Sequence, residues 1–179
     1  MLEDEQKTIK KAQDGEVEAF GLLYEHYLPK IYRFVLIKVS QREEAEDLTH
    51  QAFLKAWENI EQYNPKGYSF GSWLYRIARN TVIDHYRGER PQVSLDDVSI
   101  DIKAGGAPLT EEINAKIELE RLIELMGKLK SLEQEVLVMR FVDDLSPKEV
   151  AKAIDKSEGA VKLIQHRALK SLKEILENE

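Results

Sequence analysis

The sequence contains no cysteine among its 179 residues, which excludes disulfide bonds and thiolate metal sites. This absence suits a reducing compartment, and we expect a cytoplasmic protein. The chain also has no apolar run of about 18 residues, the length that a transmembrane helix requires, so we expect no direct membrane insertion. Its first residues, MLEDEQKTIKK, lack the basic and then apolar pattern of a secretory signal.

Motifs typical of enzymes are missing as well. The four histidines, at positions 26, 50, 85 and 166, are scattered and show no metal-binding spacing such as H-E-x-x-H. Glycine-rich phosphate-binding loops are also lacking. We therefore expect a protein that is not an enzyme, with no catalytic residues, no cofactor and no bound metal.

Charge of both signs is abundant but unevenly distributed. The net charge is -7, yet residues 62–90 contain five Lys and Arg against two Asp and Glu, and residues 146–173 contain seven against three. Between them, residues 91–114 have one basic against five acidic side chains. Two basic segments can bind nucleic acid locally. The overall acidity nevertheless predicts that unaided DNA binding is weak and sensitive to salt.

Helical periodicity extends over most of the chain. Apolar residues at spacings of three and four predict helices over 16–39 and 41–60. Further helices are predicted over 111–129 and from 131 to about 142. Three capping boxes are indicated, at Ser40 with Glu43, at Ser131 with Gln134 and at Ser146 with Glu149.

The periodicity disappears between residues 91 and 110, where prolines, a Gly-Gly pair and aspartates predict a flexible acidic linker. The predicted fold class is therefore all-α, with two small helical domains joined by this linker. We place the N-terminal domain at 1–90, the linker at 91–110 and the C-terminal domain at 111–179. The C-terminal domain is expected to contain a helix-turn-helix.

The segment FGSWLYRIARNTVIDHYRGER at 70–90 predicts a helix with two different faces. One face is apolar and contains Phe70, Trp73, Leu74, Ile77, Ala78 and Thr81. The other is expected to be exposed and contains Tyr75, Arg76, Arg79, Ile83, Tyr86 and Arg87. Tyrosine rings can stack on unpaired bases, at about 1–3 kcal/mol per base, while arginines hold phosphates. The alternative is a solvated helix whose aromatic side chains pack on a neighbouring element, and this segment alone does not decide between them.

A second DNA-binding pattern lies at 147–164, where the spacing predicts a helix-turn-helix. Val150, Ala151 and Ile154 should face inward, residues 155–156 form the turn, and Ser157 caps the second helix. The opposite face contains Gly159, Lys162, Leu163, His166, Arg167 and Lys170. Lys162, His166 and Arg167 are candidates for base contacts, and Arg140, Lys148 and Lys170 for phosphate contacts. The alternative is a helical hairpin with a solvated basic face. The caps, the small residue at Ala151 and the one-sided charge favour DNA binding.

Four segments in the same order resemble a known family. They are EAFGLLYEHYLPKIYRFV at 18–35, AEDLTHQAFLKAW at 45–57, FGSWLYRIARNTVIDHYR at 70–87 and SPKEVAKAIDKSEGAVKLIQHRALKSL at 146–172. The chain resembles an extracytoplasmic-function (ECF) sigma factor, a small two-domain branch of the bacterial sigma-70 family. The resemblance implies a transcription initiation factor that directs core RNA polymerase to promoters and helps to melt the minus-ten element.

The same resemblance implies three sets of site residues. Docking on the clamp helices of the largest polymerase subunit would involve Asp47, His50, Gln51, Phe53, Lys55 and Trp57. Minus-ten binding and melting would involve Asn64, Lys66, Tyr75, Arg76, Arg79, Asn80, Asp84, Tyr86 and Arg87. Minus-thirty-five binding would involve Arg140, Lys148, Lys162, Leu163, His166, Arg167 and Lys170. The implied partners are core RNA polymerase (the clamp helices and the flap region), promoter DNA and an anti-sigma factor.

Two further hypotheses remain open at this point. An autonomous regulator would use only the C-terminal helix-turn-helix and would bind duplex DNA specifically without polymerase, which leaves the basic aromatic helix at 70–90 without a role. A helical adaptor would leave both basic faces unexplained. Gel shifts on promoter duplexes, with and without core polymerase, distinguish these hypotheses.

Overall fold

The computed structural model of the protein describes residues 4–88 and 121–178. Every regular element in these two ranges is helical and neither contains a strand, which confirms the predicted all-α fold class. No helix in the described ranges is both long enough and apolar enough to cross a membrane. The linker predicted at 91–110 and both of its boundaries lie outside the described residues.

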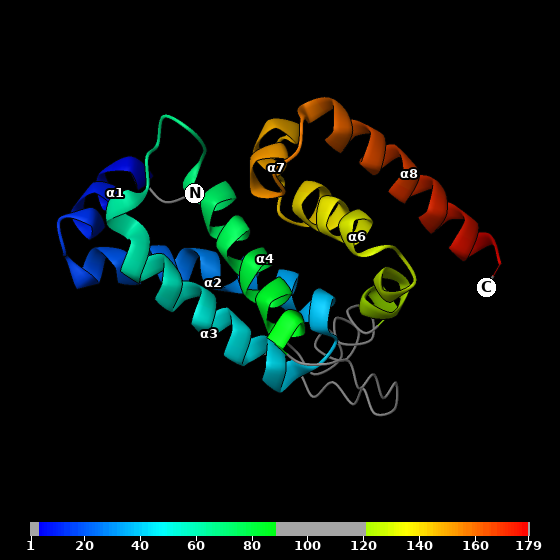
Figure 1. The fold of residues 1–179 in the computed structure, drawn as a ribbon, viewed down its shortest axis with the longest axis horizontal. Coiled ribbons are helices and arrows are strands. Elements are labelled where there is room, and N and C mark those ends of the chain that lie inside the picture. The colour runs from blue at the N-terminus through cyan, green and yellow to red at the C-terminus, as the bar shows by residue number, and fades with distance from the viewer. Residues whose placement is uncertain (1–3, 89–120, 179) are drawn as a thin grey trace, which may run out of the picture.

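The N-terminal half consists of four α-helices and one short 3-10 turn (Figure 1). These are α1 (Glu5–Gln13), α2 (Val17–Val39), α3 (Arg42–Asn59), η1 (Ile60–Gln62) and α4 (Phe70–Gly88). Helix α2 is central because it packs against α1, α3 and α4. Its apolar stripe is fully buried at Leu23, Ile31 and Phe34. The predicted helix at 16–39 is therefore confirmed, and α2 continues through Pro29.

The C-terminal half begins with helical residues 121–127. It continues with α6 (Ser131–Leu137), a π-helical turn η2 (Val138–Val142), α7 (Pro147–Ala153) and α8 (Glu158–Glu177). Helices α7 and α8 form the predicted helix-turn-helix. Val150, Ala151 and Ile154 are buried as expected, and Asp155 in the turn adopts a left-handed conformation with φ 55°.

Of the three predicted capping boxes, only one forms in the structure. At α7, the Ser146 side chain accepts a hydrogen bond from the Glu149 amide at 3.2 Å, and the Glu149 carboxylate accepts from the Ser146 amide at 2.8 Å. The box predicted at Ser40 is wrong, because Ser40 ends α2 in a left-handed conformation and Gln41 precedes α3. The box predicted at Ser131 is wrong as well, because Ser131 is the first residue of α6 and its hydroxyl accepts from Lys38.

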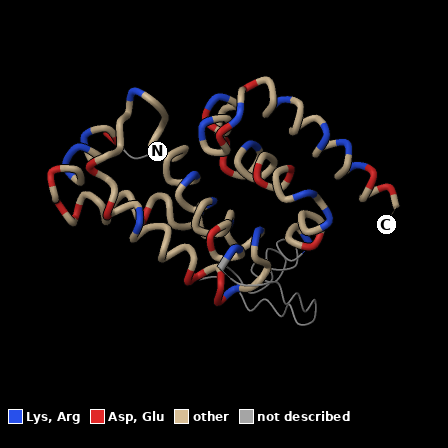
Figure 2. The backbone as a smooth tube through the Cα atoms, viewed as in Figure 1, with Lys and Arg blue, Asp and Glu red and all other residues tan. Residues whose placement is uncertain are grey.

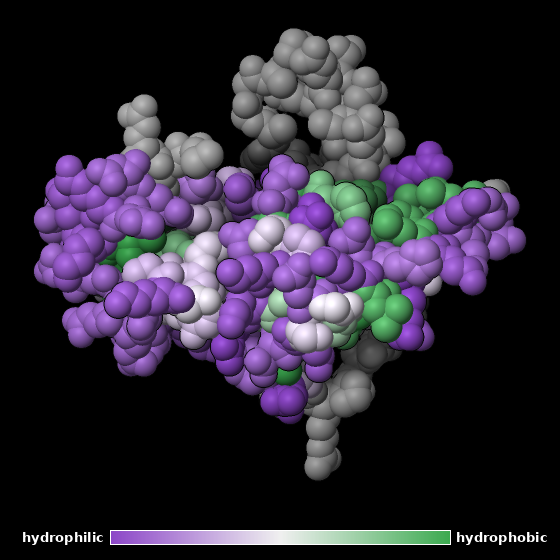
Figure 3. Space-filling model, turned by 90° about the horizontal axis from the view of Figure 1, so that it is seen from above, coloured by the Kyte–Doolittle hydropathy of each residue, from purple (hydrophilic) through white to green (hydrophobic). Residues whose placement is uncertain are grey.

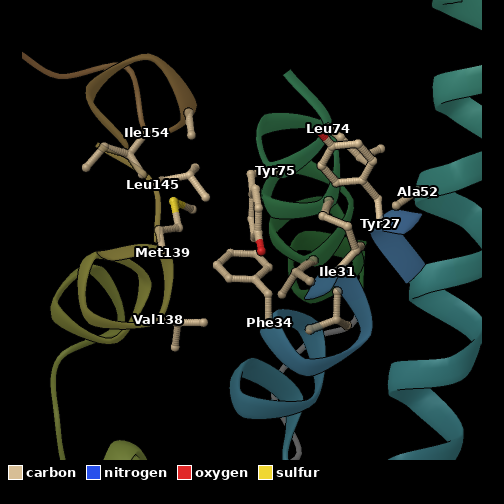
Figure 4. Close-up of a cluster of buried hydrophobic side chains, with 14 of the residues drawn as sticks. Tyr27, Ile31, Phe34, Ala52, Leu74, Tyr75, Val138, Met139, Leu145 and Ile154 are labelled. Atoms are coloured by element: carbon tan, nitrogen blue, oxygen red, sulfur yellow. The ribbon is translucent and has the colours of Figure 1, made fainter. Parts of the chain in front are cut away.

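The two halves pack together, with α4 between them. On one side α4 contacts α2 and α3, and on the other it contacts α7 (Figure 1). Figure 4 shows Tyr75 of α4 beside Phe34 of α2, with Val138, Met139 and Leu145 of the C-terminal half facing them. The Phe34 and Tyr75 rings meet edge to face with centroids 5.3 Å apart. The hydrophobic core therefore continues from one half into the other.

Candidate nucleic-acid interface

The outer face of α8 is exposed along its whole length. The helix begins where the Ser157 hydroxyl accepts a hydrogen bond from the Ala160 amide at 3.2 Å, as predicted. The predicted outer residues are all solvent-exposed; they are Gly159, Lys162, Leu163, His166, Arg167 and Lys170. Buried Val161 and Ala168 hold the opposite side of the helix against the domain. Figure 2 shows the basic residues spaced along α8.

Two of the α8 lysines are held only by exposed ion pairs within the helix. Lys162 forms an ion pair with Glu158 one turn earlier, at 2.8 Å, and Lys170 lies 3.8 Å from Glu174. Such exposed pairs contribute about 0–1 kcal/mol, so a DNA phosphate or base edge can displace them. Leu163 between them is 51 % exposed. This face has the size and chemistry to enter a major groove.

Arg140 does not belong to this exposed face. Its Nε donates to the Gln165 side chain at 3.1 Å, and its Nη1 donates to the Leu145 carbonyl oxygen. The guanidinium thus joins the π-helical turn to α8 and to the segment before α7. Arg140 was predicted among the phosphate contacts, and its partly buried, bonded guanidinium does not support that position. Lys148, by contrast, is exposed on α7.

The loop before α4 is fixed by hydrogen bonds and exposes polar side chains at its tip. Tyr63 is buried at its base and donates from its hydroxyl to the Tyr68 carbonyl at 2.9 Å. Burial, with a smaller effect from the charge of Glu5, raises the pKa of Tyr63 to about 12, so it remains a neutral donor. The Asn64 side chain accepts from the Lys66 amide at 3.0 Å, and both residues are exposed. The loop is thus a shaped polar protrusion at the start of α4.

Helix α4 exposes only part of the face that the sequence predicts. Arg76, Tyr86 and Arg87 of that face are exposed, as are Asn80 and Asp84, which the resemblance adds to the minus-ten residues. The polar residues among them, at positions 76, 80, 84 and 87, recur at helical spacing and so share one side of α4. Tyr86 is 49 % exposed, and its ring meets that of His85 edge to face with centroids 5.4 Å apart.

Tyr75 was predicted on this exposed face, and that placement is wrong for this structure. Its side chain is 0 % exposed and lies between the two halves (Figure 4). The reason is that α4 is packed on two sides. One side contacts α2 and α3, and the opposite side is covered by α7. Burial, and next the charge of Asp143, raises the pKa of the Tyr75 hydroxyl well above its ordinary value.

Arg79 is also less available than predicted. Its side chain is 24 % exposed, and its Nε donates to Glu135 of α6 at 2.7 Å. In this conformation the guanidinium that the sequence assigns to DNA therefore has a carboxylate of the C-terminal half as its partner. Ile83, placed on the same face, is half-buried.

The predicted docking face of α3 is mostly exposed. Asp47, His50, Gln51 and Lys55 are accessible, and Lys55 Nζ also donates to Thr81 Oγ1 at 3.3 Å. Phe53, which the resemblance includes among the docking residues, is buried on the inner side of α3 and packs edge to face on Tyr24 with centroids 4.6 Å apart. A docking role for Phe53 stays a prediction.

Two features of this docking face were not found from the sequence. Leu54 is 53 % exposed beside the predicted docking residues, one of which, Trp57, is half-buried with its ring centroid 4.9 Å from that of Phe20. A groove of about 460 Å³ also runs between α2 and α3. Its lining residues are Tyr24, Leu28, Pro29, Tyr32, Arg42, Glu46, Thr49 and His50. An exposed leucine in a charged helix was the available signal for this surface.

The fold and these surfaces define an all-helical DNA-binding protein with a helix-turn-helix at one end and a second polar helical face at the other. Comparison with known families agrees with this division. Sigma-70 region 2 matches residues 23–92, and Sigma-70, region 4 matches residues 125–174.

Curated relatives give the same result over nearly the whole chain. The ECF RNA polymerase sigma factor BldN of Streptomyces coelicolor is 33% identical over 97% of this chain and 66% of its own length. SigW of Bacillus subtilis, another ECF RNA polymerase sigma factor, is 31% identical over 95% of both chains. The chain belongs to the ECF sigma factors of the sigma-70 family, and not to autonomous helix-turn-helix regulators.

A solved structure supports the fold independently. CnrH, determined in complex with the cytosolic domain of CnrY, aligns with a TM-score of 0.77 over 99% of both chains, at 23% sequence identity. At this identity the likeness concerns the arrangement of the helices alone.

Proposed function

We infer that this protein binds core RNA polymerase and directs it to promoters, with each half reading one promoter element. The observation that carries this inference is the fully exposed basic face of α8, which follows a capped α7 in helix-turn-helix geometry within a region 4 match. We assign minus-thirty-five recognition to Lys162, Leu163, His166 and Arg167, with Lys148 and Lys170 at the flanking phosphates.

The N-terminal half is proposed to melt and hold the minus-ten element. Arg76, Asn80 and Arg87 are exposed on α4, and the loop at 63–69 directly precedes this helix. Capturing bases that have left the duplex offsets an unstacking cost of a few kcal/mol, so melting requires no catalytic group. This role makes the protein a transcription initiation factor rather than an enzyme.

Docking on polymerase is proposed to use the exposed side of α3. Asp47, His50, Gln51 and Lys55 provide polar contacts around Leu54, whose exposed side chain would be buried on binding. The polymerase supplies electrostatic attraction that a protein of net charge -7 lacks. An anti-sigma factor is proposed as a regulatory partner, as the family resemblance implies, and the cytoplasm as the location.

Reconstituted transcription tests this function. The purified chain and bacterial core polymerase should together start transcription at sites that core polymerase alone does not select, on genomic fragments that carry candidate promoters. Replacing Arg76 and Asn80 by alanine should reduce permanganate-detected melting about tenfold or more, with polymerase binding unchanged. Lys7→Ala, an exposed change on α1, is the control. Failure of the parent chain to bind core polymerase, or to alter start-site choice, contradicts the proposal.

A further inference from the structure

Helix α1 is tied to the start of the loop before α4 by one side chain. The Gln13 side-chain amide donates to two backbone carbonyl oxygens, that of Ile60 at 3.0 Å and that of Tyr63 at 2.8 Å. Ile60 begins the η1 turn, and Tyr63 is the residue that follows it. Figure 1 shows α1 and this loop at the same end of the N-terminal half. Gln13 therefore fixes the place where the loop at 63–69 begins.

A second link from α1 supports the end of the same loop. Glu5 accepts a hydrogen bond from the Tyr27 hydroxyl of α2. The Tyr27 ring lies 5.4 Å from that of Phe70, the first residue of α4, and a Cβ added to Gly71 would be 3.3 Å from Tyr27 Cε1. Burial, and next the hydrogen bond to Glu5, raises the pKa of Tyr27 well above its ordinary value, so its hydroxyl remains a donor.

The two ends of the loop meet on a shared aromatic base. The Tyr63 and Phe70 rings pack edge to face with centroids 5.4 Å apart, and the Tyr63 hydroxyl donates to the Tyr68 carbonyl oxygen at 2.9 Å. The tip at 64–67 is exposed. Seen from above, the N-terminal half presents mostly hydrophilic side chains (Figure 3). Because an exposed polar tip has few apolar contacts to order it, its shape is set at its base.

These contacts assign α1 a part in promoter recognition. We propose that Gln13 is a positioning residue for the minus-ten element, which acts through the backbone of Ile60 and Tyr63. Together with the link between Glu5 and Tyr27, it holds the 63–69 loop in the shape that captures a base displaced from the duplex. The inference rests on the function proposed above for the N-terminal half.

The physical basis is preorganisation of the loop. A loop that is ordered before binding loses less conformational freedom when it captures a base, so capture is tighter and more selective. The Ile60 carbonyl oxygen also accepts from the Tyr63 amide at 3.1 Å, so Gln13 anchors a turn that already exists. Buried Ile9 and Ala12 hold α1 in the core. Loss of the Gln13 bonds should therefore loosen the loop without detaching the helix.

Three single substitutions isolate these contacts. Gln13→Met keeps a side chain of similar length and removes the donor. Tyr27→Phe keeps the ring and removes only the bond to Glu5, so it tests the other end of the loop independently. Gln6→Met is the matched control, because it makes the same change at an exposed position on the same helix.

Amide hydrogen exchange in the full-length chain, followed by NMR, measures the order of the loop without DNA or polymerase. The Tyr63 and Gly67 amides donate to carbonyl oxygens of Ile60 at 3.1 Å and Asn64 at 3.2 Å. Gln13→Met should speed their exchange about tenfold, because two hydrogen bonds that restrain the turn are lost. Exchange at Val161 in α8 should stay unchanged, and Gln6→Met should match the parent.

Transcription with core polymerase measures the effect on recognition. On a promoter that the parent selects, activity is compared with that on templates carrying single-base changes in the minus-ten element. Gln13→Met should reduce this selectivity ratio about tenfold. Tyr27→Phe should reduce it at the same base positions by less, and both variants should bind core polymerase like the parent. A protein that is only less stable loses activity on every template equally, which leaves the ratio unchanged.

The proposal is overturned if Gln13→Met leaves loop exchange as in Gln6→Met, or if the selectivity ratios of both test variants equal that of the control. Failure of the proposed function has a different signature, because the parent itself would then select no start sites. The exchange rates of the loop amides depend on neither DNA nor polymerase, so they still show whether Gln13 orders the loop.

Discussion

Tyr75 is the residue where two kinds of interaction compete at one position. Its ring is completely buried against Phe34 and the C-terminal half, but its hydroxyl has no hydrogen-bond partner of ordinary geometry among the described residues. The aromatic ring stabilises the closed structure through burial, whereas the hydroxyl makes burial less favourable. The two contributions can be separated by substitution.

Tyr75→Phe and Tyr75→Ala should have effects of very different size on stability. Tyr75→Phe removes only the hydroxyl that faces Asp143 and should change the free energy of unfolding by less than about 1 kcal/mol. Tyr75→Ala leaves a cavity and should cost about 3–5 kcal/mol. Urea denaturation followed by circular dichroism measures both. If Tyr75→Phe instead lost several kcal/mol, the hydroxyl would have a bonding role that the structure does not show.

At the scale of elements, predicted caps were correct around the helix-turn-helix but wrong at Ser40 and Ser131. The box at Ser146 and Glu149 and the cap at Ser157 both form as predicted, because Pro147 and the left-handed Asp155 fix where α7 and α8 begin. The face of α4 was predicted only in part. A single helix period indicates which residues share a face, but not that a distant segment such as α7 covers a second face.

The capping box at the start of α7 allows its contribution to stability to be predicted. Burial alone would raise the pKa of Glu149, but hydrogen bonds from the Ser146 side chain and backbone outweigh it and lower the pKa. Its stabilising effect is therefore present above the ordinary carboxyl pKa and is lost as pH falls through the lowered value. Ser146→Ala should cost about 1 kcal/mol at neutral pH. Ser171→Ala on α8 is the comparison, and an equal loss in both would contradict a capping role.

Helix α8 should determine upstream selectivity. Alanine at both Lys162 and Arg167 removes two exposed polar groups without touching the buried side of the helix. Because a good base contact provides about 1–3 kcal/mol of discrimination, selectivity between matched and scrambled minus-thirty-five elements should fall about tenfold or more. Competitive transcription from the two templates measures this ratio, with Lys173→Ala near the C-terminal end as control. An unchanged ratio would place recognition elsewhere.

At the scale of the whole molecule, two domains that each bind DNA weakly alone become effective when both are held on one polymerase surface. In the closed arrangement of this structure the C-terminal half is folded back on the N-terminal half. Helices α6 and α7 then cover part of the α4 surface that we assign to the minus-ten element. The sequence predicted the two modules and their order, because caps and periodicity are local. It could not predict the Glu135 contact, because Glu135 lies 97 residues from Lys38 and 56 from Arg79. No local pattern pairs charges over such separations.

This closed arrangement should depend on pH through Asp143. Burial raises the pKa of Asp143, opposed by Tyr75, Arg33 and Lys30 and aided by Asp144. The closed form therefore binds a proton more readily than the open form, so this residue favours opening at neutral pH and favours closing as pH falls through the raised pKa. Asp143→Asn should raise the closed fraction at pH 7, and its difference from the parent should shrink towards pH 4.

Energy transfer between dyes attached at Glu58→Cys and Lys173→Cys, which are exposed on α3 and α8, measures this dependence, and a neighbouring residue provides the control. Asp144 is exposed and left-handed with φ 56°, a conformation that asparagine also tolerates, so Asp144→Asn should follow the parent closely. Other carboxylates titrate in the same range, but they are common to all three proteins, and the difference between variant and parent isolates Asp143. A constant difference from pH 4 to pH 7 would show that the charge of Asp143 has no part in opening the two halves.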